Sequence, residues 1–448
     1  MSDPHSVAPG DRAGAARAWF VVGILMLAYV VSFMDRQVLN LLVGPVRHDL
    51  GINDTQMSLL LGFSFAIFYS ICGIPLGRLA DTRNRRGLIV AGIVLWSFMT
   101  ALCGTARQYW QLFLYRIGVG VGEAALSPAA YSMIADYFPP ERRATAMSIY
   151  SMGIYIGSGV GFIAVAIVVK WAAGYGVIDL PLFGVTQPWQ LVFFVLGLVG
   201  IAFTAVLLLI KEPARTGKVG GSAQGEVPFS AVLAYLWHNR RTVLSHNIGF
   251  ALISFVSYGA SAWIPTFFIR THGWTAQQAG LVFGLMVTFA GSAGILFGGW
   301  LSDHWRRAGK TDAGMRVGIT TGVLGLVGGV YLLMPDGTLA AIALVPATFI
   351  YAMPFGAAPA AIQEIMPNEM RGQASAVYLF IVSMIGLGLG PTAVALVTDF
   401  VFHDDKALRW SLLAVGSVAM ICSMTVLYSG LASYRDTHGR MKAALAPA

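Results

Sequence analysis

The chain has little charge for its length. Lys, Arg, Asp and Glu make up 11% of its 448 residues, while 56% of the residues are hydrophobic; soluble proteins carry about 25% charged residues. So few charges cannot cover the surface of water-soluble domains of this total length, and the apolar remainder must face lipid. The composition therefore excludes a soluble globular protein and indicates an integral membrane protein.

Cysteine is scarce as well. Cys72, Cys103 and Cys422 are the three in the chain, and each lies in an apolar run. They cannot form a disulfide framework, and their spacing matches no zinc site. We expect them to be packing residues, and we expect neither a metal nor another cofactor.

Sequence motifs of catalysis are missing too. The chain contains neither the His-Glu-x-x-His of zinc proteases nor the Gly-x-Ser-x-Gly of serine hydrolases, and His246 stands alone in sequence. Gly118, Gly120 and Gly122 lack the spacing and the preceding strand of a dinucleotide-binding loop, so close helix packing explains them better. We expect no catalytic residues and no enzymatic activity.

Long hydrophobic runs, by contrast, recur along the whole chain. Each is long enough to cross a bilayer, which takes about 20 residues. The first follows a polar tail and has no small-residue cleavage site after it, so we interpret it as a retained helix and not as a signal peptide. The sequence predicts an all-α membrane protein with twelve transmembrane helices at 18–45, 55–79, 87–106, 109–137, 145–169, 189–210, 243–268, 276–301, 316–334, 339–366, 373–401 and 410–433.

The basic residues predict the orientation of these spans. With the N-terminus in the cytoplasm, 21 of the 29 Lys and Arg residues fall on the cytoplasmic side and 6 on the outer side. Cytoplasmic loops of membrane proteins are enriched in Lys and Arg. The net charge of +8 is thus a signal of topology and not of nucleic-acid binding. We expect a bacterial inner-membrane protein with both termini in the cytoplasm.

The two halves of the chain repeat each other. Residues 77–81 and 299–303 share Gly-x-Leu-x-Asp at an offset of 222, and residues 139–150 and 367–378 share Pro-x-Glu-x-Arg-x-x-Ala-x-x-x-Tyr at an offset of 228. A duplicated six-helix unit is the architecture of alternating-access transporters. The predicted parts are a tail at 1–17, a bundle at 18–210, a linker at 211–242, a bundle at 243–434 and a tail at 435–448; within the linker, 228–238 is a candidate for an interfacial helix.

The repeated segments also carry a family resemblance. Residues 77–86 resemble the loop signature Gly-x-Leu-x-Asp-Arg-x-Gly-Arg-Arg of the major facilitator superfamily, departing from it at 82–84, and residues 116–120 resemble its fourth-helix signature. Within that superfamily, 33–37 and 116–124 resemble bacterial spinster-type transporters, and hexuronate and other organic-anion symporters share parts of both runs. The resemblance implies the major facilitator fold and proton-coupled transport of a sphingolipid- or lysolipid-like substrate.

Four charged residues lie inside predicted spans of the first half: Asp35, Arg36, Arg116 and Glu123. A charge at this depth costs several kcal/mol unless it faces the bundle interior and finds a partner. Arg116 and Glu123 are seven residues apart and share a helix face, and a rise of about 1.5 Å per residue places Asp35 between them in depth. Arg36 points about 100° away from Asp35 on its helix, so we expect it to make a separate contact.

Two interpretations of these charges remain open. They are either structural ion pairs that join spans 1 and 4, or a site of proton coupling. In the second interpretation Asp35 and Glu123 take up protons, while Arg116 alternates between a carboxylate and an anionic substrate head, with Arg36 as a further head contact. A buried carboxyl favours its neutral form and a nearby arginine opposes this, so withdrawal of Arg116 would promote protonation. A structural ion pair does not need two acids and two bases in one region, and this excess of charged residues favours proton coupling.

The resemblance also implies a cytoplasmic gate. In the superfamily the Asp of the loop signature caps helix 11 and stabilises the outward-open state, and a carboxylate at a helix N-terminus is stabilising. Solvated aspartates at helix ends, and arginines that serve topology and headgroup contact, are the alternative. The gate residues implied are Gly77, Asp81, Arg85 and Arg86 in the first half and Asp303 in the second.

The second half offers weakly polar candidates for a substrate cavity. Serines and a tyrosine in span 7 are spaced three and four apart and share a face, and aromatic residues of later spans add to them. A charged wall opposite an apolar one suits an amphipathic substrate with an anionic or zwitterionic head. We expect a monomer whose partners are that substrate, protons and membrane lipids; the alternatives are a symporter of a small anion such as a hexuronate and, from another class, a passive channel or scramblase. The predicted cavity residues are Ser254, Ser257, Tyr258, Ser261, Phe289, Tyr351 and Tyr378.

Overall fold

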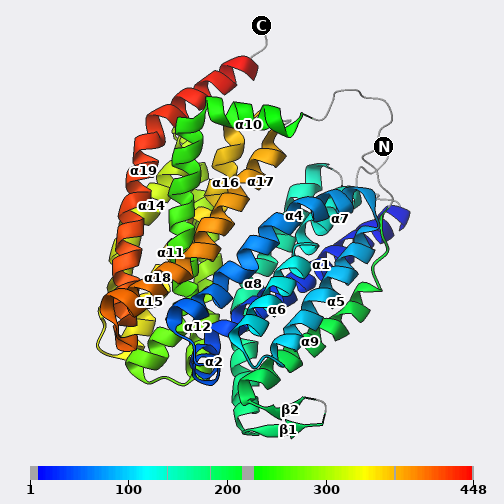
Figure 1. Cartoon of the computed structure of the whole chain (residues 1–448). Helices are drawn as coiled ribbons and strands as arrows, with labels where there is room; N and C mark the ends of the chain where they lie inside the picture. Colours follow the sequence, from blue (N-terminus) through cyan, green and yellow to red (C-terminus); the bar gives the residue numbers. More distant parts are fainter. Residues whose placement is uncertain (1–8, 139, 182, 214–226, 368–369, 446–448) are drawn as a thin grey trace. The chain divides into compact units, whose positions relative to one another are not determined.

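The computed structural model describes residues 9–138, 140–181, 183–213, 227–367 and 370–445. Within them the chain is almost entirely helical, as predicted, with one small hairpin (Figure 1). It divides into two compact units, Met1–Val38 with Phe68–Gly221 and Leu39–Ile67 with Ser222–Ala448. The division expected at the linker assigns 39–67 to the first half, whereas by contacts these residues group with the second.

The first unit contains the predicted spans 1 to 6, apart from the outer ends of spans 1 and 2. A two-stranded antiparallel hairpin follows its fifth span, with Ile178 opposite Thr186 and Leu180 opposite Gly184. Gly184 has φ 68°, a conformation that favours glycine. The elements are α1 (Pro9–Leu41), α4 (Ser64–Thr82), α5 (Arg85–Cys103), α6 (Tyr109–Glu123), α7 (Leu126–Tyr137), α8 (Pro140–Ala173), β1 (Ile178–Leu180), β2 (Gly184–Thr186) and α9 (Pro188–Leu207).

Glycines bring the helices of this unit close together. A Cβ atom on Gly157 of α8 would lie 2.8 Å from Phe33 Cβ of α1, and one on Gly122 of α6 would lie 2.7 Å from Trp96 N of α5. Both distances are too short for a side chain, so α8 and α6 can approach their neighbours only at glycine. This close packing fixes the positions of α1 and α6, the two helices that carry the buried charges.

The predicted fourth span is not one continuous helix. It consists of α6 and α7, which are interrupted at Ala124 and Ala125. Pro128 lies four residues after Ala124, and a proline removes the hydrogen bond to the carbonyl four residues before it. Neither piece reaches the length of a span, so the described residues contain 11 helices that are long and apolar enough to cross a membrane. The expected count of twelve is therefore not confirmed.

The second unit contains the remaining spans and the outer ends of spans 1 and 2. Four of its segments are π-helical (η1, η2, η5, η6), and two are 3₁₀-helical (η3, η7). Its elements are α2 (Val43–Leu50), α3 (Asp54–Ser58), η1 (Leu59–Phe63), α10 (Phe229–His238), α11 (Arg240–His272), α12 (Ala276–Met286), η2 (Val287–Gly291), α13 (Ser292–Arg307), α14 (Ala313–Gly328), η3 (Gly329–Leu333), α15 (Gly337–Ala352), α16 (Pro354–Glu364), α17 (Arg371–Val382), η5 (Ser383–Leu389), α18 (Gly390–Val397), η6 (Thr398–Phe402), η7 (Asp405–Ala407) and α19 (Leu408–Leu445).

Spans 2 and 8 each contain a π-helical turn. The turns lie at residues 59–63 and 287–291, an offset of 228, whereas the sequence motif that the same two spans share repeats at an offset of 222. The first of these turns packs tightly, because a Cβ atom on Gly62 would lie 2.1 Å from the carbonyl oxygen of Leu387 in η5.

The helix expected within the linker is present as α10. Val232 and Leu236 bury one of its faces in the core of the second unit, and Tyr235 Oη donates to the carbonyl oxygen of Ile365 at 2.9 Å. Figure 1 shows α10 lying across the ends of α16 and α17. Phe229 and Trp237 on the same helix are 54% and 70% exposed, as an interfacial position requires.

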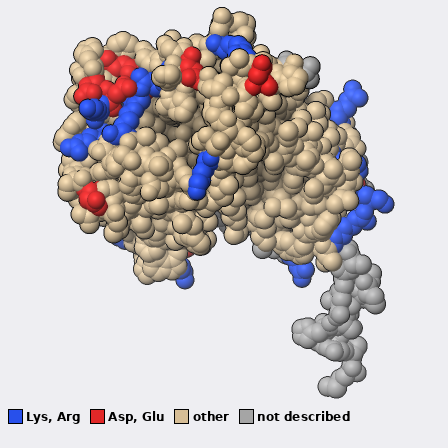
Figure 2. Space-filling view, turned by 90° about the horizontal axis from the view of Figure 1, so that it is seen from below, with Lys and Arg blue, Asp and Glu red and all other residues tan. Residues whose placement is uncertain are grey.

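Charged side chains are few on the end of the molecule that carries the hairpin. Figure 2 shows this face as mostly uncharged, with acidic side chains gathered beside basic ones on one side.

Candidate functional site

The buried charges of the first unit are centred on Glu123, the last residue of α6. Its side chain is 1% exposed. Glu123 Oε2 accepts hydrogen bonds from Ser32 Oγ at 2.6 Å and from Arg36 Nε at 2.7 Å, both on α1. The interruption of span 4 directly follows this residue, so the carboxylate stands at a helix end beside α1.

Asp35 lies in the same region. It is 5% exposed, and its Oδ2 accepts a hydrogen bond from Thr100 Oγ1 of α5 at 2.6 Å. Arg116 and Glu123 are both near enough to interact with it electrostatically. The structure thus brings together Asp35, Arg116 and Glu123, whose meeting was inferred from helix depth.

Arg36 does not make the separate contact that we expected. It pairs with Glu123, and its guanidinium carbon also lies 4.4 Å from the ring centre of Phe33 and 4.8 Å from that of Tyr69. The long arginine side chain spans the angular offset from Asp35 that the helix imposes. Aromatic faces stabilise a guanidinium, so these contacts hold Arg36 within the cluster.

Each acid of this cluster keeps one oxygen unbonded. Asp35 Oδ1 and Glu123 Oε1 are buried and have no hydrogen-bond partner among the described residues. A buried carboxylate with an unsatisfied oxygen is costly, and uptake of a proton is one way to remove that cost. Arg116, 1% exposed, supplies a second buried positive charge. This arrangement can exchange protons, which fully paired acids do less readily.

The residues proposed for the cytoplasmic gate have different environments. Arg85 is 1% exposed; its guanidinium pairs with Asp136 and, at 3.3 Å, with Glu212, so it joins the start of α5 to the end of α7 and to the segment after α9. Gly77 and Arg86 are half-buried, and Asp303 is exposed, 3.8 Å from Arg306. The side chain of Asp81 lies outside the described residues.

The predicted cavity residues of the second unit do not all face one space. Ser254 packs against Gly386, where an added Cβ would lie 3.0 Å from the serine Cβ. Tyr378 is buried with its ring centre 5.3 Å from that of His246, and Phe289 is 70% exposed. Tyr258 and Ser261 are half-buried.

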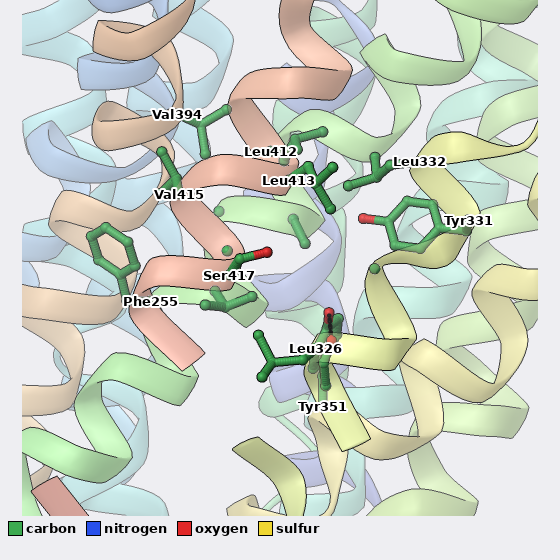
Figure 3. A pocket seen from close by; sticks show the side chains of 16 residues that line it. Phe255, Leu326, Tyr331, Leu332, Tyr351, Val394, Leu412, Leu413, Val415 and Ser417 are labelled. Atoms are coloured by element: carbon green, nitrogen blue, oxygen red, sulfur yellow. Dashed lines mark hydrogen bonds between the residues drawn. The ribbon is translucent and has the colours of Figure 1, made fainter. Parts of the chain in front are cut away.

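Tyr351 instead lines a cavity inside the second unit (Figure 3). The cavity has room of about 30 Å³ for water centres and is bounded by α11, α14, η3, α15, α18 and α19. Tyr351 Oη donates to the carbonyl oxygen of Gly325 at 3.0 Å, and Ser257 Oγ donates to the carbonyl oxygen of Tyr351 at 3.4 Å. In Figure 3 the hydroxyls of Tyr331 and Ser417 point into the cavity from opposite sides. Its lining is otherwise apolar.

An outer ion-pair network is the main feature that the sequence did not reveal. Asp54, fully buried at the start of α3, accepts hydrogen bonds from Arg270 Nη1 at 2.6 Å and Nη2 at 2.8 Å and lies 3.0 Å from Arg47 Nη1. Asp405 pairs with Arg47 at 2.6 Å, and Asp399 accepts from Thr55 N and Oγ1, each at 2.7 Å. The network joins the outer ends of spans 1, 2, 7 and 11.

Two of these three acids are ion-pair partners of arginines. Carboxylate oxygens of Asp54, Asp399 and Asp405 come within 4.8 Å of one another. However, Arg47 and Arg270 bind two of the three, and their guanidiniums supply the positive charge that a cation would otherwise bring. One signal of this network was present in the sequence: arginines occur on the predicted outer side, where Lys and Arg residues are few.

Long apolar helices, an internal repeat and buried opposite charges together define a membrane transporter built from two related halves. The sequence pattern of the Major Facilitator Superfamily matches residues 25–391. The chain belongs to this superfamily of transporters, whose members are generally not enzymes.

Individual relatives are of similar length. The chain is 30% identical to an MFS-type efflux pump of Mycolicibacterium smegmatis, over 95% of each protein. It is 24% identical to the sphingosine-1-phosphate transporter SPNS2 of Danio rerio, over 96% of this chain and 87% of that one. A crystal structure of a bacterial homologue of the human lysosomal transporter spinster, inward-facing and unoccupied, superimposes with a TM-score of 0.77 at 25% identity, covering 96% and 99% of the chains. The resemblance to spinster-type transporters is therefore confirmed.

Proposed function

We propose that this protein is a proton-coupled secondary transporter that works by alternating access. The observation that carries the proposal is the buried cluster in the first unit, where Asp35 and Glu123 each keep an oxygen without a partner. Purely structural ion pairs would satisfy both oxygens of each acid. Unsatisfied acids beside buried arginines are the arrangement that a titrating site needs.

The proposed switch is electrostatic. With Glu123 ionised, Arg36 is held at 2.7 Å; a proton on the free oxygen Oε1 removes the charge and weakens that pair. In the same way, a proton on Asp35 would weaken the attraction between Asp35 and Arg116. One proton moving down 100 mV supplies about 2.3 kcal/mol, and a difference of one pH unit adds about 1.4 kcal/mol. These energies suffice to shift an equilibrium between two states of similar stability.

For the substrate we propose a sphingolipid- or lysolipid-like amphipathic molecule. Support comes from the similarity over nearly the whole chain to a relative described as a sphingosine-1-phosphate transporter. Buried guanidiniums suit a phosphate head, because they donate two parallel hydrogen bonds to it. The large apolar surface of the helices suits an acyl tail.

A symporter of a small organic anion is the second candidate. Arg116 supports it, since a buried guanidinium binds a carboxylate as well as a phosphate. In this case substrates such as hexuronates would compete for the same cluster. A passive channel or scramblase would not depend on the proton gradient at all.

We further propose that the protein acts as a monomer in the bacterial inner membrane with both termini in the cytoplasm. The distribution of 21 Lys and Arg residues on the cytoplasmic side against 6 on the outer side supports this orientation. Labelling of single cysteines with a membrane-impermeant reagent in intact cells tests it.

The central experiment is uptake into proteoliposomes with an imposed pH gradient. We expect Asp35→Asn and Glu123→Gln to lose gradient-driven transport by at least about tenfold, the effect of 1.4 kcal/mol on the driving equilibrium, while inserting normally. Asp179→Asn, an exposed acid in β1, is the matched control and should behave as the wild type. A fluorescent lysolipid and a radiolabelled hexuronate are compared as substrates.

Each outcome has a defined meaning. Lysolipid uptake that a protonophore abolishes supports the leading proposal, and hexuronate uptake with the same sensitivity supports the second. Transport that persists with a protonophore favours a channel or scramblase. Full gradient-driven transport by both acid variants would contradict proton coupling through this cluster.

A further inference from the structure

A second, smaller cavity adjoins Asp35 inside the first unit. It lies between α1, α5 and α9 and offers about 10 Å³ to the centre of a water molecule, which is about what one water needs. Asp35, Ser97 and Thr100 supply its polar atoms. Its remaining lining residues are Val31, Met34, Trp96, Leu196, Val199 and Gly200.

Two unpaired polar atoms belong to residues of this cavity. Asp35 Oδ1 and Ser97 Oγ are buried without a hydrogen-bond partner among the described residues, and the two residues are 5% and 1% exposed. Thr100 Oγ1 donates to Asp35 Oδ2 and keeps lone pairs of its own. A buried water commonly makes two to four hydrogen bonds to such groups. These three side chains meet that requirement.

A glycine keeps the cavity open. A Cβ atom on Gly200 of α9 would lie 2.1 Å from Ser97 Oγ. Any larger residue at this position would displace the hydroxyl and fill the space. The absence of a side chain at 200 therefore preserves room beside two polar groups that lack partners.

We propose that this cavity is a hydration site, and that its water is the immediate proton donor to Asp35. The water binds Asp35 Oδ1, Ser97 Oγ and Thr100 Oγ1. A hydronium at this position, formed with a proton from bulk water, transfers that proton to Oδ1 and leaves a neutral water and a neutral carboxylic acid; release follows the reverse path. This inference rests on the proposed role of Asp35 in proton coupling.

The surroundings of Asp35 leave this path separate from the ion pairs. Arg116 and Glu123 on α6 and Arg36 on α1 are the charged groups that act on Asp35, and the Cys103 thiol of α5 also interacts with it. From α9 the cavity receives only Leu196, Val199 and Gly200, which carry no charge. On the side of α9, therefore, only uncharged residues border the proposed water.

Infrared spectroscopy of the whole protein in lipid tests the proposal. The carbonyl band of protonated Asp35, identified by its loss in Asp35→Asn, is followed during exchange from H₂O into D₂O. We expect Ser97→Ala and Gly200→Ala to slow this exchange roughly tenfold, the usual effect of losing one hydrogen bond to a charged group. Gly23→Ala, where an added Cβ meets nothing within 4 Å, and Ser127→Ala are matched controls that should exchange as the wild type does.

The outcomes separate this inference from the proposed function. If the wild type shows no band of protonated Asp35 at any pH at which it transports, the proposed role of Asp35 in proton coupling fails. If the band is present and exchanges at an unchanged rate in Gly200→Ala, the hydration site is refuted. Should Gly200→Ala not fold, the double variant Ser97→Ala/Gly200→Ala is used in its place, because the hydroxyl that its methyl group would strike is then absent.

Discussion

Asp35 in the first unit and Asp54 in the second are buried to a similar degree but are bonded in opposite ways. Asp54 has both oxygens bound by Arg270 and lies close to Arg47 as well. Asp35 has one oxygen bound by a hydroxyl, and its other oxygen is without a partner among the described residues. The same side chain therefore serves in one place as a fixed ion-pair partner and in the other as a group with an open position.

Burial alone does not determine how a carboxylate behaves; its hydrogen-bond and ion-pair partners do. A buried carboxylate that two guanidiniums enclose has its charge balanced in place, and removal of a partner is expensive. A buried carboxylate with an open oxygen has less to lose when it becomes neutral. Stability should thus depend strongly on the Asp54 network and weakly on Asp35, while pH-dependent behaviour should depend on Asp35.

The largest expected effect is that of removing Arg270. Arg270→Ala leaves Asp54 buried with Arg47 as its remaining near charge, and loss of one partner from a buried pair costs about 3–5 kcal/mol. Thermal unfolding in detergent measures this loss. Lys406→Ala, at an exposed position next to the network, is the control and should unfold as the wild type does.

A double variant sharpens this first test. Asp54→Asn/Arg270→Gln removes both charges, so it should recover a large part of the stability lost in Arg270→Ala. If Arg270→Ala unfolds at the wild-type temperature, Asp54 is not held as the structure indicates, and the contrast with Asp35 disappears.

A matched pair of aspartate variants is expected to give the next largest effect. Asp54→Asn removes the negative charge and replaces one of the two acceptor oxygens by an NH₂ group that faces Arg270, so at least one charge-assisted hydrogen bond, worth about 1.5–3 kcal/mol, is lost. Asp35→Asn keeps an acceptor for Thr100, and its amide group can still bond the proposed water in place of the open oxygen, so we expect a cost below about 1 kcal/mol. Chemical or thermal unfolding of both variants under one condition decides between them; equal costs would show that the open oxygen has no energetic meaning.

Much of this architecture was predictable from sequence, for physical reasons. Twenty apolar residues in a row and charges within such a run are both rare, so the spans and residues such as Asp35 and Glu123 stand out. The pairing of Arg36 with Glu123 was not predictable, because the helical angle fixes where a side chain starts but not where a long one ends.

The outer ion-pair network, by contrast, could not be predicted from the sequence. Arg270 and Asp54 are 216 residues apart and lie at helix ends, where charges are ordinary, so nothing in the sequence links them. Pro128 was the signal in the sequence for the interruption of span 4, because prolines bend helices, but a proline does not specify a division into two helices.

Asp312, at the cytoplasmic start of α14, lies outside the spans and should give the smallest effect. Burial acts to raise the pKa of Asp312, but hydrogen bonds from Arg316 and Arg435, each at 2.7 Å, outweigh it and lower that pKa below its usual value. The stability that this carboxylate contributes is therefore present above about pH 4 and is lost as the pH falls through the lowered pKa. The arginine side chains are 34% and 49% exposed, so solvent screening limits the contribution to about 1 kcal/mol.

Unfolding of Asp312→Asn as a function of pH measures this contribution. The variant should be less stable than the wild type at neutral pH. The difference should shrink as the pH falls below about 4 and vanish once the pH is below the lowered pKa of Asp312, because both side chains are then uncharged. Asp436→Asn, whose partner Arg440 lies 3.7 Å away on an exposed helix face, should show almost no difference at any pH. If the difference in stability between Asp312→Asn and the wild type instead widened toward acid, the predicted sign would be wrong. Asp312 would then resemble Asp35, with its open oxygen, more than Asp54, with its two arginines.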